Sequence, residues 1–166
     1  CSGPLVFVAQ GTVDMHAYRL VSSAIRAFGG KNYRLAVACE KWDVDGNLPD
    51  NVVTTGKTPY NNILSVADVF VTNGGFGGVM MALSRGVPVI VAGRSDDNGE
   101  VGARVEYSGA GINLMTSQPG PSVLSSAVKK ILSTSEYRDR AKLIGNRIRS
   151  QNASNTICDI LEEKLS

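Results

Sequence analysis

The sequence predicts an α/β domain built on a doubly wound, Rossmann-like parallel sheet of about six strands, with helices on both faces. Short β-rich apolar segments alternate along the chain with stretches of helical periodicity. Several of these segments are apolar throughout, as expected of parallel strands that are buried on both faces. The length of 166 residues, 43% of them hydrophobic and 19% charged, suits one domain over residues 1–166 and is short for two.

The elements follow from the hydrophobic pattern and from the residues that begin and end each segment. We expect strands at residues 5–9, 33–39, 52–54, 69–72, 87–92 and 111–114. We expect helices at residues 15–28, 60–66, 77–85, 100–108, 121–132, 136–150 and 155–165. Asp14 is a plausible N-cap of the first helix, and Gly29 and Gly30 end it.

Composition and charge exclude several classes of function. The net charge of +2, from 17 basic and 15 acidic side chains, is no reason to expect nucleic acid or an anionic membrane surface as a partner. No apolar run approaches the ~20 residues that a membrane-spanning helix needs. Cys1, Cys39 and Cys158 lie far apart and form no disulfide or zinc pattern, which favours a reducing, cytoplasmic location. The chain has neither an initiator Met nor a leader segment, so we expect an excised piece of a longer protein.

Two junctions between a strand and a helix are rich in glycine: residues 10–12 and residues 73–78, the latter reading Asn-Gly-Gly-Phe-Gly-Gly. Glycines let the backbone approach phosphate oxygens, and the free amides and dipole of the following helix attract an anion. The loop is neither a Walker A sequence nor a GxGxxG fingerprint. Taken alone, its glycines fit close packing as well as ligand binding.

A longer set of motifs surrounds this loop. Val-Phe-Val-Thr-Asn-Gly-Gly-Phe-Gly-Gly occupies residues 69–78, and Ala-Leu-Ser-Arg-Gly-Val-Pro occupies residues 82–88. Asp97-Asn98, Ala-Arg-Val-Glu at residues 103–106 and Gly-Ala-Gly-Ile at residues 109–112 follow. Together they resemble the donor-binding motif of the family 1 UDP-glycosyltransferases, and most closely that of the microbial macrolide-type and sterol-type enzymes. The resemblance implies that the chain is one half of a GT-B fold.

The same resemblance implies which positions bind the sugar donor. The residues expected at the diphosphate are Gly11, Thr12, Asn73, Gly74, Gly75, Gly77, Gly78 and Val79. Those expected at the nucleobase are Lys57, Thr58 and Tyr60, and those expected at the sugar are Asp97 and Asn98. No catalytic residue, metal or other cofactor is expected in this chain. Glu100 and Glu106 are expected to pair with Arg104 and its neighbours instead of acting in catalysis.

The sequence departs from the family pattern at several of these positions. Asn73 replaces the usual histidine, so it can donate a hydrogen bond but carries no charge. Met81 stands where many members have an acid for the ribose hydroxyls, and Lys57 stands where they have a stacking aromatic residue. Asp97-Asn98 replaces an acidic-Gln pair. The resemblance implies a UDP-sugar donor, but these departures weaken the specificity for UDP, so dTDP-sugars are left open.

The resemblance implies a nucleotide-sugar-binding domain of an enzyme that transfers a hexose to a hydroxyl of a small molecule. The acceptor and the catalytic base belong to an N-terminal domain, so we expect this chain to be inactive alone. Residues 152–166 are expected to form a helix that packs on that domain, folds back on this one, or is covered by self-association. A subunit of a split glycosyltransferase and a non-catalytic nucleotide-binding module remain alternatives.

Overall fold

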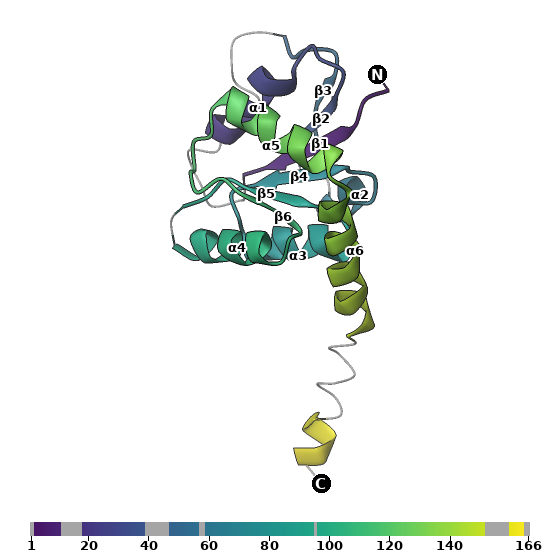
Figure 1. Ribbon diagram of the computed structural model, residues 1–166. Helices are drawn as coiled ribbons and strands as arrows, with labels where there is room; N and C mark the ends of the chain where they lie inside the picture. Colours follow the sequence, from purple (N-terminus) through teal and green to yellow (C-terminus); the bar gives the residue numbers. More distant parts are fainter. Residues whose placement is uncertain are drawn as a thin grey trace.

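The computed structural model describes residues 2–10, 18–38, 47–56, 59–94, 96–151 and 160–164, without the side chains of Tyr18 and Asp96. The strands are β1 (Leu5–Ala9), β2 (Arg34–Ala38), β3 (Val52–Thr54), β4 (Val69–Thr72), β5 (Val89–Val91) and β6 (Gly111–Asn113). The helices are α1 (Tyr18–Phe28), α2 (Tyr60–Leu64), α3 (Phe76–Ser84), α4 (Asp96–Tyr107), α5 (Pro121–Ser133) and α6 (Ser135–Ser150). Residues 160–164 are also helical (Figure 1).

The six strands form one parallel sheet in the order β3-β2-β1-β4-β5-β6. From β1 the chain builds outward to β3 on one side, and it then returns to β4 and builds outward to β6 on the other side. The direction of winding therefore reverses between β1 and β4, which is the position where doubly wound sheets bind their ligands. The predicted fold class is confirmed.

Helices bury both faces of the sheet, so its strands carry apolar side chains on both faces. On one face, Val6 and Val8 of β1 pack in a cluster with apolar residues of α1 and α5. On the other face, Phe7 and Ala9 pack in a second cluster with residues of α2, α3, α4 and α6. Figure 1 shows α1 and α5 on one side of the sheet and α3 and α4 on the other. Alternate residues of a strand thus serve different helical layers.

One boundary differs from the expectation by more than two residues among those that the structure describes. Helix α4 begins at Asp96, four residues before the predicted start at Glu100. The apolar periodicity begins only at Val101, so the pattern predicts a loop for the acidic residues before it. Carboxylates are favoured in the first turn of a helix because they face its positive end. Asp97 and Asn98 therefore lie in the first turn of a helix, and the proposed cap Asp14 lies outside the described residues.

Candidate functional site

The carboxyl ends of β1, β4 and β5 lie level with one another in the centre of the sheet. Ala9 pairs with Thr72, and Thr72 pairs with Val91. The segments that leave these strands, at residues 10, 73 and 92, therefore start side by side at one edge. A ligand at this edge can contact all three connections at once.

Gly74 brings the connection after β4 into contact with α4. Its φ is +101°, a conformation that residues with side chains rarely adopt. A Cβ at this position would lie 2.8 Å from Cγ1 of Val91 and 3.1 Å from the backbone oxygen of Asn98. The structure thereby places the predicted diphosphate loop against one residue of the predicted sugar-binding pair, although more than 20 residues separate them in the sequence.

Gly93 holds the connection after β5 against the same loop. A Cβ on Gly93 would lie 1.8 Å from the backbone oxygen of Asn73 and 3.0 Å from Cβ of Asn98. No side chain fits at such a distance, so only glycine allows the two connections to pass this closely. The resemblance did not assign Gly93 to the site, and its role here is to bring the two loops together.

The side chain of Asn73 stabilises the loop and keeps part of its hydrogen-bonding capacity. Its Oδ1 accepts from the backbone N–H of Gly75 at 3.3 Å and from Oγ1 of Thr72 at 3.4 Å. The N–H of Gly74 donates to Oγ1 of Thr72 at 3.4 Å. Among the described residues no acceptor faces Nδ2 of Asn73, which leaves this amide group able to donate to an anion.

Helix α3 opens with backbone amides that no side chain caps. Its N-cap is Gly75, and the first N–H to bond within the helix is that of Val79, which donates to the Gly75 oxygen at 3.1 Å. The N–H groups of Phe76, Gly77 and Gly78 precede this bond and have no partner inside the helix. Free amides at this end of a helix, together with the helix dipole, can attract an anion.

This geometry changes the expected set of amides by one residue. Val79 was expected at the diphosphate, but its N–H is used within the helix and its side chain lies in the core with 3% exposed. Phe76, which the expectation omitted, has an amide without a partner inside the helix, and its side chain is 65% exposed. The signal for this residue is the position where the helix begins. A helix that begins one residue earlier leaves the N–H groups one residue earlier without a partner inside the helix.

The glycines of α3 differ in what they contact. A Cβ on Gly78 would lie 3.6 Å from the ring of Phe70, in ordinary contact with the core. A Cβ on Gly77 would meet no atom of the described residues within 4 Å. Nothing in this part of the protein requires a glycine at position 77, although alanine is the better residue in a helix.

The predicted nucleobase residues are only partly described. Lys57 and Thr58 lie outside the described residues, as do Gly11 and Thr12 of the diphosphate set. Tyr60 begins α2, and its ring lies edge-on to Phe7 with the ring centres 5.2 Å apart. Burial raises the pKa of the Tyr60 hydroxyl above its ordinary value of 10.0. The ring therefore packs between α2 and the sheet.

Gln10, the first residue of the glycine-rich junction at residues 10–12, is a buried polar residue at the carboxyl end of β1. Its side chain is 5% exposed, and its Oε1 accepts from the N–H of Leu20 at 3.1 Å. Leu20 lies in the first described turn of α1, whose early amides lack partners inside the helix. The Gln10 carboxamide thus joins the end of β1 to the first described turn of α1.

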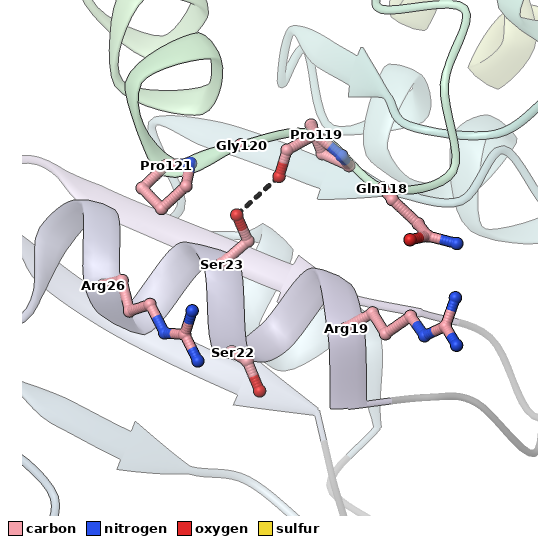
Figure 2. Close-up of a pocket in the computed structure, with 8 residues that line it drawn as sticks. All are labelled: Arg19, Ser22, Ser23, Arg26, Gln118, Pro119, Gly120 and Pro121. Atoms are coloured by element: carbon pink, nitrogen blue, oxygen red, sulfur yellow. Dashed lines mark hydrogen bonds between the residues drawn. The ribbon is translucent and has the colours of Figure 1, made fainter.

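A groove of about 380 Å³ lies between α1 and the start of α5 (Figure 2). Arg19, Ser22 and Arg26 of α1 line it on one side and residues 118–121 on the other. Ser23 closes its floor by donating from Oγ to the backbone oxygen of Pro119 at 2.5 Å. Of the residues predicted to bind the donor, none that the structure describes lines this groove.

Other candidate chemistry is limited in the part of the chain that the structure describes. The single histidine and the three cysteines lie outside it. The ranges given above contain no group of three residues suited to hold a metal ion. Arg104 pairs with Glu100 at 2.5 Å, which confirms the expected ion pair. None of the described helices has the length and apolar character to cross a membrane.

Proteins of one family are similar to this chain over most of its length. The family described as "Erythromycin biosynthesis protein CIII-like, C-terminal domain" matches residues 35–164. UDP-glycosyltransferase 2 of Phaeomoniella chlamydospora is 33% identical over 96% of this chain, which covers 37% of that protein. The 4'-demethylrebeccamycin synthase of Lentzea aerocolonigenes is 35% identical over 96% of this chain, which covers 38% of it. The chain thus spans less than two fifths of the length of these relatives.

Solved structures show the same fold. The calicheamicin glycosyltransferase CalG4 superposes with a TM-score of 0.86 at 24% identity, over 99% of this chain and 44% of that one. The spinosyn rhamnosyltransferase SpnG superposes with a TM-score of 0.87 at 20% identity, over 98% and 45%. SpnG complexed with thymidine diphosphate superposes with a TM-score of 0.84 at 21% identity, over 98% and 46%.

Proposed function

This chain belongs to the family of erythromycin biosynthesis protein CIII-like C-terminal domains, and we propose that it is the donor-binding half of a glycosyltransferase. The diphosphate of a nucleotide-sugar binds at residues 73–78, and the sugar lies toward Asp97 and Asn98. The complete enzyme transfers a hexose to a hydroxyl of a small-molecule acceptor.

One observation carries this proposal: the contact between the loop after β4 and the first turn of α4. The resemblance implies that the loop binds phosphate and that Asp97-Asn98 binds sugar, and a nucleotide-sugar joins these two groups covalently. A single donor can reach both only if the two segments are neighbours. Gly74 against Asn98 and Gly93 against Asn73 make them neighbours.

The chemistry that the loop supplies is electrostatic. When the bond between the anomeric carbon and the diphosphate oxygen breaks, the electron pair stays on the departing nucleoside diphosphate. The amides of Phe76, Gly77 and Gly78 and the dipole of α3 stabilise this developing charge without having to reorganise. The base that removes the proton from the acceptor hydroxyl belongs to the part of the enzyme that this chain does not contain.

Two nucleotides fit the proposal. Relatives of this chain are named UDP-glycosyltransferases, and SpnG, which shares the fold, has been solved with thymidine diphosphate. Met81, at the position where the resemblance places a carboxylate for ribose, contributes no charge and packs against the core. A site without that carboxylate distinguishes less between ribose and deoxyribose, so we propose that both UDP- and dTDP-sugars bind.

The acceptor half belongs to a partner domain on the same chain or on a separate one. The relatives are more than twice as long as this chain, which leaves room in them for a further domain. A split enzyme, with the acceptor domain as a separate subunit, is the alternative form of the proposal. Transfer activity that appears only when a separate acceptor domain is mixed with this chain would support that form.

Titration of UDP and of TDP into the chain tests the donor site, with calorimetry for affinity and amide NMR shifts for location. We expect shifts at residues 74–78, and the same affinity with EDTA present, because the phosphates bind to backbone amides. Gly77→Ala is expected to weaken binding about tenfold, because the Cβ of the new alanine would stand among the backbone amides that bind the diphosphate. It should leave the fold at least as stable as in wild type.

Gly120→Ala is the control, because Gly120 is the N-cap of α5 and its Cβ, like that of residue 77, would meet no described atom within 4 Å. This variant should bind UDP and TDP as wild type does. Absence of heat and of amide shifts with both nucleotides in the wild-type chain would refute the donor site. Such a result would favour a module that keeps the fold without nucleotide binding.

A further inference from the structure

The proposed diphosphate site lacks positive charge in its main loop. Residues 73–79 include no Lys, Arg or His, and Asn73 is neutral. A nucleoside diphosphate carries several negative charges, whereas a helix dipole contributes only about half a positive charge at its N-terminus. Charge-assisted hydrogen bonds from a cation are about twice as strong as those from neutral amides. The site is therefore incomplete unless a cation reaches it from another segment.

Arg94 lies in a segment that the structure holds against this loop. Its preceding residue, Gly93, contacts the backbone oxygen of Asn73. Four residues after Arg94, the backbone of Asn98 contacts Gly74. A Cβ on Gly99 would lie 3.3 Å from the backbone oxygen of Arg94, so the first turn of α4 also packs on it. These contacts fix the backbone of Arg94 at the edge of the loop.

The side chain of Arg94 is exposed and has no hydrogen-bond or ion-pair partner in the described part of the chain. Other arginines are engaged: Arg104 pairs with Glu100, and Arg138 with Asp68. The two segments that meet here are residues 73–78 and residues 93–98. Arg94 is the only cationic residue in these two segments. A guanidinium presents its donors in a planar fork that suits phosphate oxygens.

We propose that Arg94 binds the diphosphate of the donor and supplies the positive charge that Asn73 and the amides of α3 do not. This inference rests on the proposed function and adds a specific residue to it. Arg94 acts on the phosphate that bears the sugar, the β-phosphate, because Gly93 and Asn98 place it on the side of the loop where Asp97 and Asn98 face the sugar. It therefore favours nucleoside diphosphates over monophosphates.

Calorimetric titration of Arg94→Gln with UDP, TDP, UMP and TMP tests this assignment. We expect the affinity for the diphosphates to fall about 10- to 100-fold, the range for losing a hydrogen-bonded charge. The affinity for the monophosphates should fall much less, so the preference for UDP over UMP shrinks. Arg94→Lys keeps the charge but loses the planar fork of donors. Its affinity for the diphosphates should therefore lie between those of wild type and Arg94→Gln.

Arg85→Gln is the matched control, because Arg85 is exposed at the opposite end of α3 and its loss changes the net charge equally. Denaturant unfolding should show all three variants folded, as expected for exposed side chains. Equal affinity of Arg94→Gln and Arg85→Gln for UDP, or an equal loss for UDP and UMP, overturns the assignment while the donor site stands. Absence of binding by the wild-type chain overturns both.

Discussion

At the scale of single residues, Asn51 shows how one side chain can organise a turn. Its Oδ1 accepts from the N–H of Gly30 at 2.7 Å. Its Nδ2 lies near the backbone oxygens of Phe28, Lys31 and Tyr33 at 2.9, 3.2 and 2.9 Å. The end of α1 and the entry to β2 are thus held by the residue that precedes β3, because a carboxamide both donates and accepts.

The variant Asn51→Asp tests this arrangement. A carboxylate cannot donate to the three backbone oxygens, and its charge repels them, so the free energy of unfolding should fall by about 2–4 kcal/mol. Denaturant unfolding monitored by circular dichroism measures the change. Asn61→Asp, the same substitution at an exposed position of α2, should change it by no more than about 0.5 kcal/mol. Equal effects of the two variants would contradict the role of Asn51.

The residue scale also shows why the glycines of the site could not be interpreted from the sequence alone. Gly74 and Gly93 are required by close contacts with α4 and with Asn73, whereas Gly77 contacts no described atom within 4 Å. In the sequence all of them look alike. Only the neighbours in space separate a glycine that packs from one that leaves room for a ligand.

At the scale of elements, α2 is held to the sheet by an aromatic cluster. The Tyr60 ring lies edge-on to Phe7, and the Phe7 and Phe70 rings stack with their centres 5.2 Å apart. This five-residue helix is too short to be stable without such packing. The resemblance assigned Tyr60 to the nucleobase, and in this structure the ring also anchors the helix.

The raised pKa of Tyr60 predicts how stability changes in alkaline solution. Between pH 10 and the higher pKa of the folded state, the unfolded chain loses the proton and the folded chain keeps it. The free energy of unfolding contributed by this group is therefore present below pH 10 and falls as the pH rises above it. Denaturant unfolding of Tyr60→Phe between neutral pH and pH 11 should show a shallower fall than wild type.

Tyr107→Phe provides the comparison for this experiment, because it removes the same hydroxyl from a side chain that is 96% exposed. This variant should keep the pH dependence of the wild-type chain. If Tyr60→Phe also keeps it, burial of the Tyr60 hydroxyl does not affect stability.

At the scale of the whole molecule, the last segment differs from the rest of the described chain. Helix α6 packs on α3: Ala141 is buried, and a Cβ on Gly145 would lie 2.4 Å from the backbone oxygen of Leu83. In residues 160–164, by contrast, Ile160 and Leu161 are 51% and 54% exposed. The apolar side chains described there are available for another surface, as the resemblance implies for residues 152–166.

Truncation after Gln151 tests whether the tail stabilises this domain. We expect the free energy of unfolding to change by no more than about 0.5 kcal/mol, the usual range for exposed groups. Truncation after Thr134 removes α6 as well, and it should destabilise the domain strongly because α3 loses its packing partner. Thermal and denaturant unfolding report both changes. A large loss from the shorter truncation would show that the tail packs on this domain.

The sequence by itself determined the elements and the class of fold. Continuous, β-branched apolar segments such as Val69–Thr72 predict strands that are buried on both faces, and helical periodicity separates them. Glycine-rich junctions marked where a ligand could approach, because glycine and a free helix end are local properties. The motifs around residues 69–112 supplied the family to which the loop belongs.

The tertiary structure alone decided which of these local features form one site. The order of the strands brings the ends of β4 and β5 together, and the contact of Gly74 with Asn98 depends on that order. The packing of Tyr60 against Phe7 also follows from the folded surroundings. Such properties arise from contacts between residues far apart in the chain, so no local pattern of residues encodes them.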